Sequence, residues 1–157
     1  MDFNFDRYNG DFQKHLARHL PGSKIAGSVF THPRFRTTRQ IIDYAYEQIK
    51  EDYVGRRLVR EIEYHENVGL EGIILVREVP RHFKIKRGTR VKKAKDSKRS
   101  PSYTALIVEG LARPKTNRMV IIAEPVDGIH RFSSIYPGRY APEFDDAKFW
   151  RENALIV

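Results

Sequence analysis

Cysteine is absent from this chain of 157 residues. Its absence excludes a disulfide framework, a thiol nucleophile and thiolate ligands for a metal ion, and it suits a reducing compartment. Disulfide-stapled scaffolds and cysteine-dependent enzymes are therefore ruled out. The chain is long enough to bury a real core, so we predict a single domain over residues 1–157.

Long apolar runs are absent as well. No stretch approaches the ~18 apolar residues of a membrane-spanning helix, and no signal-peptide pattern follows Met1. We therefore expect a protein that neither spans a membrane nor carries its own export signal, and that acts in the cytoplasm.

Acidic residues are nearly missing from one segment, residues 81–99. It holds ten lysines and arginines against a single acid, Asp96, and carries the whole net charge of +9. Such a concentration is typical of a surface that binds a polyanion, with a solvated basic loop as the alternative. Phe83, Ile85 and Val91 recur with a strand-like period, and no amphipathic helix accompanies the charge. We therefore favour nucleic acid as the partner over a membrane surface.

Two histidines four residues apart, His15 and His19, stand near the front of the chain. On an α-helix this spacing places both imidazoles on one face, one turn apart. The same face carries apolar and aromatic side chains, at Phe5, Tyr8, Phe12 and Leu16. We therefore expect the pair to point inward. Because a helix C-terminus favours a cation, His19 should hold its proton more readily than His15.

The pair has three interpretations. The structural one is a pair of core histidines, each hydrogen-bonded to a backbone carbonyl. The catalytic one is general acid and base work, because an imidazole exchanges protons near neutrality. The third is a metal site, but the chain lacks cysteine and a His-Glu-x-x-His cluster to complete the ligands. We expect neither a metal ion nor another cofactor.

Helices are expected first and strands afterwards, which is the α+β pattern. A first helix is predicted over about residues 11–20, and a second begins at a capping box of Thr37 and Gln40 and ends by about residue 53. The strands are expected at Leu58–His65, Gly72–Val79, Phe83–Val91, Tyr103–Glu109, Met119–Glu124 and Ile129–Tyr136.

These elements predict N-terminal helices packed on one mostly antiparallel sheet of about four to six strands, within residues 58–136. The Asp127-Gly128 pair predicts a hairpin between the last two strands. A mobile loop is expected at residues 95–102, and a short closing helix at residues 142–154.

The predicted last strand carries a second group of polar side chains. Simple alternation places His130, Phe132, Ser134 and Tyr136 on one face and Arg131, Ser133 and Ile135 on the other. The Ser134 hydroxyl and the Tyr136 phenol could then donate to the oxygens of one phosphate. A structural role for both is the alternative, because strands often carry Ser and Tyr.

Together these motifs resemble a known family. A His-x-x-Arg-His helix, a Gly-Ser-x-Phe segment with an amphipathic helix after it, a strand-rich second half and a Ser-x-Tyr-Pro strand follow one another over about residues 11–138. This order resembles the small ribonuclease toxin domains of bacterial polymorphic and contact-dependent inhibition systems, of the barnase/EndoU-like type. Bacterial ribonuclease A-like toxin domains share a similar layout.

The resemblance implies roles only at matching positions. His15 and His19 match the family's histidine pair, Ser134 its hydroxyl position, where threonine is usual, and Tyr136 its tyrosine. Three residues compete for the family's cationic position, namely Lys84, Lys86 and Arg87. The resemblance also implies an immunity protein or antitoxin as a partner.

We therefore predict a metal-independent endoribonuclease, in which one histidine deprotonates a ribose 2′-hydroxyl and the other protonates the leaving 5′-oxygen. RNA, with tRNA as one candidate, is the expected substrate. The residues expected to bind its phosphates are Lys84, Lys86, Arg87, Arg90, Lys92, Lys93, Lys95 and His130. The alternatives are a non-catalytic nucleic-acid-binding module that uses the basic segment, and a partner-binding domain that keeps only the fold.

Overall fold

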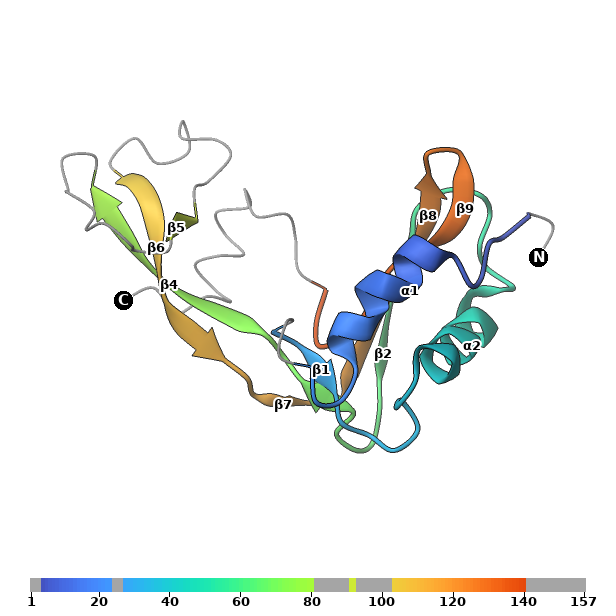
Figure 1. Cartoon of the computed structure of the whole chain (residues 1–157), viewed down its shortest axis with the longest axis horizontal. Helices are drawn as coiled ribbons and strands as arrows, with labels where there is room; N and C mark the ends of the chain where they lie inside the picture. The colour runs from blue at the N-terminus through green and yellow to red at the C-terminus, as the bar shows by residue number, and fades with distance from the viewer. Residues whose placement is uncertain (1–3, 24–26, 81–90, 93–102, 141–157) are drawn as a thin grey trace. The chain divides into compact units, whose positions relative to one another are not determined.

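The computed structural model describes residues 4–23, 27–80, 91–92 and 103–140, and they have the predicted α+β structure (Figure 1). The helices are α1 Gly10–Leu16, the 3₁₀ turn η1 Ala17–His19 and α2 Thr38–Ile49. The strands are β1 Val29–Phe30, β2 Leu58–Glu63, β3 Gly69–Leu70, β4 Ile73–Pro80, β5 Val91–Lys92, β6 Tyr103–Ala112, β7 Lys115–Thr116, β8 Arg118–Val126 and β9 Ile129–Pro137.

The chain divides into two compact units. Unit 1 comprises Met1–Gly72 with Arg113–Tyr140, and unit 2 comprises Ile73–Ala112 with Ala141–Val157. The described strands form three antiparallel sheets of three strands each, and not one sheet of four to six. Unit 1 contains the sheets β2-β8-β9 and β1-β3-β7, and unit 2 contains β4-β6-β5.

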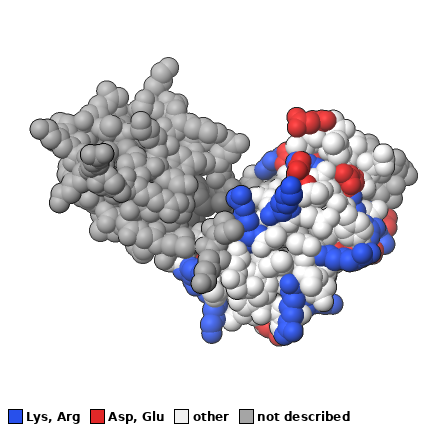
Figure 2. Space-filling model, viewed as in Figure 1, with Lys and Arg blue, Asp and Glu red and all other residues white. Residues whose placement is uncertain are grey.

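Three predicted features fall outside the described residues in whole or in large part. They are the closing helix at residues 142–154, the loop at residues 95–102 and the strand at residues 83–91, of which only Val91 is described. Among the residues that the structure does describe, no helix is both long and apolar enough to cross a membrane. On the described face seen in Figure 2, basic and acidic side chains are interspersed.

The helix α2 begins where its sequence predicts. The Thr37 hydroxyl accepts from the Gln40 backbone N–H at 3.1 Å, and the Gln40 side chain accepts from the Thr37 backbone N–H at 3.2 Å, which completes the capping box. One stripe of the helix is fully buried, at Ile41, Ile42, Ala45 and Ile49. This stripe joins alternate residues of β8, at Met119, Ile121 and Ala123, in the core of unit 1.

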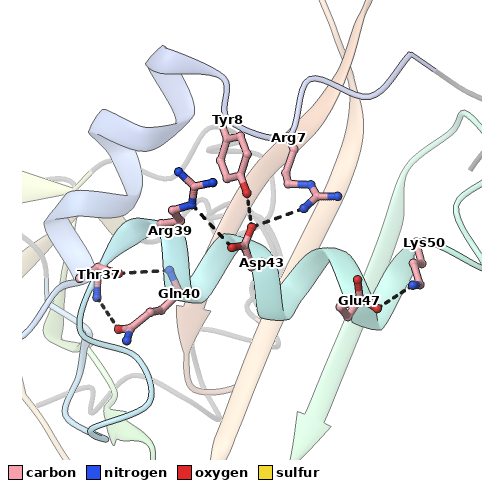
Figure 3. Close-up of polar contacts among 8 residues, drawn as sticks. All are labelled: Arg7, Tyr8, Thr37, Arg39, Gln40, Asp43, Glu47 and Lys50. Atoms are coloured by element: carbon pink, nitrogen blue, oxygen red, sulfur yellow. Dashed lines mark hydrogen bonds and ion pairs between the residues drawn. The ribbon is translucent and has the colours of Figure 1, made fainter.

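The segment before α1 is attached to α2 through Asp43 (Figure 3). The Asp43 carboxylate accepts from the Tyr8 hydroxyl and from Arg7 Nη1 at 3.5 Å, and it lies 3.9 Å from Arg39 Nε. The Arg7 guanidinium also lies 3.7 Å from the centre of the Tyr46 ring. These contacts of Arg7 and Tyr8 hold the segment before α1 against α2.

The β8–β9 hairpin closes as its sequence predicts. Asp127 and Gly128 both have positive φ, 51° and 78°, and both belong to the tight turn between the strands. Asparagine, aspartate and glycine tolerate this left-handed region best, so the local sequence specifies the turn.

A β-bulge interrupts β9. Ile122 pairs with Ser134, whereas the next residue, Ala123, pairs with Phe132, so Ser133 is an extra residue. The prediction that Phe132 shares a face with Ser134 and Tyr136 is therefore wrong. Phe132 lies in the core, while Ser134 and Tyr136 lie on the opposite face of the sheet.

Candidate active site

The helix α1 and the turn η1 run alongside β9 in the same direction. Three contacts define the alignment. Arg131 Nη1 donates to Asn9 Oδ1 at 3.2 Å. The ring centroids of Phe12 and Phe132 lie 5.7 Å apart, and those of His19 and Tyr136 lie 6.2 Å apart. The chain from Asn9 to His19 rises about 16 Å. The strand from Arg131 to Tyr136 covers only the four β8 steps from Glu124 to Val120, about 13 Å, because Ser133 is the extra residue of the bulge.

The contact between His19 and Tyr136 joins the two groups of predicted site residues at one end of the alignment. His15 stands about 9 Å along the helix from Asn9. Ser134 pairs with Ile122, two β8 residues from Glu124, the partner of Arg131, so it stands about 7 Å along the strand from Arg131. Both residues therefore lie between the contacts at the two ends of the alignment.

The two histidines lie together, as their spacing predicts. Their ring centroids are 5.7 Å apart, and the ring planes are inclined at 69°. The expectation that they point inward is wrong for His15, which is exposed, while His19 is half-buried. Each follows a buried residue, Phe12 or Leu16, by three positions. Three residues rotate an α-helix by about 300°, so each histidine lies about 60° around the helix from the buried residue before it. The histidines therefore flank the buried stripe.

Ser28 holds the His19 ring. The Ser28 carbonyl oxygen lies 2.8 Å from His19 Nδ1, and the Ser28 hydroxyl lies 3.0 Å from the same atom. A carbonyl oxygen can only accept, so Nδ1 carries a proton in this arrangement. In the neutral ring the lone pair is then on Nε2, which makes Nε2 the basic nitrogen.

Loss of water around the ring lowers the pKa of both histidines, of the half-buried His19 and also of His15, which keeps an exposed side. For His15, desolvation is the largest cause, and the positive charges of Arg18 and Arg131 lower the pKa further. For His19, desolvation is again the largest cause, and it outweighs the opposing effect of the Ser28 carbonyl. Burial therefore acts against the expectation that His19, at the C-terminal end of the helix, holds its proton readily.

The face of the sheet that carries Ser134 and Tyr136 also carries Arg131. Arg131 pairs with Glu124, which alternates with the core residue Ala123 and so lies on the opposite face from it. Sequence reasoning missed Arg131, because simple alternation assigns it to the other face. It also missed Ser28, whose only signal is its place in the Gly-Ser-x-Phe segment.

His130 lies apart from the histidine pair. Its Nδ1 is 2.7 Å from the Tyr53 hydroxyl, and its backbone carbonyl accepts from the Asp6 N–H at 2.8 Å. It alternates with Phe132 and so faces the core side of the sheet. These contacts attach the N-terminal segment to β9, which is a structural role.

Most of the basic residues expected to bind phosphate fall outside the described part of the chain. These are Lys84, Lys86, Arg87, Arg90, Lys93 and Lys95. Lys92 lies in β5, where its backbone pairs with Leu106.

No group of three or more His, Asp or Glu side chains in the described part of the chain is arranged to hold a metal ion. No protein-family model, curated protein or solved structure matches this chain. The resemblance to bacterial ribonuclease toxin domains therefore stays a prediction.

Proposed function

We propose that the protein is a metal-independent endoribonuclease whose acid and base are His15 and His19. The observation that carries the proposal is the imidazole pair itself, with centroids 5.7 Å apart and one ring held by a backbone carbonyl. Two imidazoles at this separation can serve the two oxygens of one phosphodiester.

His19 is the proposed general base. Because its Nδ1 proton is donated to the Ser28 carbonyl, its Nε2 carries the lone pair that takes the proton of a ribose 2′-hydroxyl. Desolvation lowers its pKa, which favours the neutral ring that can accept a proton. The 2′-oxygen then attacks the adjacent phosphorus.

His15 is the proposed general acid. Its pKa is also lowered in the free protein, so it takes up its proton when the negative phosphate of the substrate binds beside it. It gives a proton to the 5′-oxygen as the bond between that oxygen and phosphorus breaks. The products are a 2′,3′-cyclic phosphate and a free 5′-hydroxyl. The Ser134 hydroxyl and the Tyr136 phenol, which share one face of the sheet and of which Tyr136 lies beside His19, donate to the phosphate oxygens as negative charge develops on them.

RNA is the proposed substrate because it carries the nucleophile, and the basic segment at residues 81–99 is proposed to attract it. The protein would act in the cytoplasm. By its resemblance to the toxin domains, it would also have an immunity protein or antitoxin as a partner. A nucleic-acid-binding module without chemistry is the second candidate, which the concentrated positive charge alone would support.

The test is cleavage of a defined RNA in excess EDTA, with the ends of the products identified by mass spectrometry. We expect full activity, a 2′,3′-cyclic phosphate on one fragment and a 5′-hydroxyl on the other. A substrate with one 2′-deoxy sugar at the cleaved position should bind and resist cleavage there. Loss of activity in EDTA, or efficient cleavage of the 2′-deoxy substrate, would contradict the mechanism.

The matched variants are His15→Ala and His19→Ala. Each should reduce cleavage by about a hundredfold or more, since a positioned acid or base contributes on that scale. RNA binding should stay near the wild-type level. Binding without cleavage in the wild-type protein would favour the non-catalytic module.

A further inference from the structure

Arg131 differs from the other half-buried arginines in the described part of the chain. These are Arg7, Arg60, Arg118 and Arg131. The first three each have a carboxylate within 4 Å, from Asp43, from Asp52, and from Glu61 and Glu63 respectively. Among the described residues Arg131 has none. A charge that is partly removed from water usually has a partner of opposite sign, so this arginine calls for an anion.

The neighbouring acid is already engaged. Glu124 pairs with Arg131 across the two strands, but its Oε2 accepts from Arg57 Nη1 at 2.9 Å and from the Ser133 hydroxyl at 2.6 Å. The bulge brings Ser133 to this acid. The acid nearest to Arg131 in the sheet is therefore bound by another arginine.

Asn9 orients the Arg131 guanidinium. Asn9 Oδ1 accepts from Arg131 Nη1 at 3.2 Å and from the Phe12 backbone N–H at 3.1 Å, as the N-cap of α1. A guanidinium has five N–H donors in a planar fork. One donor to Asn9 fixes the plane and leaves others for a ligand.

The surroundings of Arg131 are positive and rich in donors. Its charge and that of Arg18 act on His15, and Ser134 and Tyr136 share its face of the sheet. Cationic groups beside hydroxyl donors suit a phosphate, whose oxygens only accept.

The structure assigns to Arg131 a phosphate-binding role, in which its guanidinium holds a phosphate oxygen beside His15. The inference deepens the proposed function, where that phosphate is the one that is cleaved. It places the cation of the site on β9, whereas the sequence leaves Lys84, Lys86 and Arg87 in competition for that position.

The experiment is an NMR titration of the His15 imidazole against pH, with and without inorganic phosphate, in the full chain. In the wild-type protein, bound phosphate should raise the pKa of His15, because it neutralises the nearby arginines. In Arg131→Gln, phosphate should bind about tenfold more weakly or worse. The pKa of His15 without phosphate should also move upward in this variant, because a repelling charge is gone.

Two further variants make the outcome decisive. Arg56→Gln removes an exposed arginine that has no carboxylate partner among the described residues, and it should behave like wild type. Arg131→Lys keeps the charge but not the fork, so it should retain part of the phosphate response even if the glutamine variant folds poorly. A phosphate response that Arg131→Gln and Arg131→Lys leave unchanged would overturn the inference, and so would a wild-type His15 that does not respond to phosphate.

The result can be separated from that of the proposed function. A wild-type protein that cleaves no RNA but binds phosphate through Arg131 would sustain the phosphate site and reject the nuclease. Cleavage that persists undiminished in a folded Arg131→Gln would sustain the nuclease and reject this site.

Discussion

At the scale of single residues, the contact between His19 and Ser28 has the largest chemical consequence. A backbone carbonyl 2.8 Å from Nδ1 is fixed by the fold, so it specifies which nitrogen of the ring carries the proton. The same contact is what a purely structural histidine would make. The 5.7 Å between the two rings follows from their spacing on one helix face, and the His15 ring also contacts Phe12, so variants of both histidines are needed to separate the two interpretations.

The lowered pKa values of His15 and His19 predict a pH dependence of stability. The ordinary value for both is 6.5, and burial brings each below it in the folded protein. Below about pH 6.5 the unfolded chain therefore binds more protons than the folded one. The free energy of unfolding should fall as the pH falls from 6.5 to the folded pKa values, and this contribution should then level off.

The measurement is urea unfolding followed by circular dichroism at several pH values between 5 and 8. His19→Gln should weaken the dependence, because it removes one of the two groups. The matched control is His65→Gln, which replaces an exposed histidine outside the site. Identical pH dependence in wild type and His19→Gln would show that burial of this ring is not coupled to folding.

At the scale of elements, the sequence predicts the helix caps and turns that are determined by residues close together in the chain. The capping box of Thr37 and Gln40 and the Asp127-Gly128 turn are complete within a few positions, and both are confirmed. The bulge at Ser133 could not be predicted, because an extra residue is defined only against the partner strand. The error at this one position misplaced Arg131.

The N-caps of the two helices provide a matched pair of variants. Asn9→Ala and Thr37→Ala should each cost about 1 kcal/mol of stability, since each removes a side chain that accepts from a helix N–H. Only Asn9→Ala should also reduce RNA cleavage, because Asn9 holds Arg131 as well. The measurements are thermal unfolding and kcat/KM. Equal losses of activity in both variants would indicate that helix stability alone matters.

At the scale of the whole molecule, the division into two units was not predicted. Strand periods are visible in the sequence, but the partner of each strand is not, so six predicted strands were assigned to one sheet. The described strands instead form three sheets. The single-domain prediction stays a prediction, because two compact units are compatible with one cooperative domain.

The charge distribution gives a prediction at this scale. Replacing Lys92, Lys93 and Lys95 together by glutamine should weaken RNA binding, and the slope of log affinity against log salt should fall by about one for each phosphate that the variant no longer neutralises. The charge-matched control replaces three exposed arginines of unit 1, Arg34, Arg36 and Arg56. Filter binding at several salt concentrations measures both. Equal effects in both triple variants would mean that total charge, and not the basic segment, governs binding.

The extra residue in β9 has a consequence for how related sequences should align with this one. Deleting Ser133 would restore simple alternation and leave Phe132, Ser134 and Tyr136 each on its present face. Deleting Ile135 would instead turn Ser134 and Tyr136 to opposite faces. A related sequence could therefore lack the residue at Ser133 and still present Ser134 and Tyr136 on the same face of the sheet. It would lose the hydrogen bond from the Ser133 hydroxyl to Glu124.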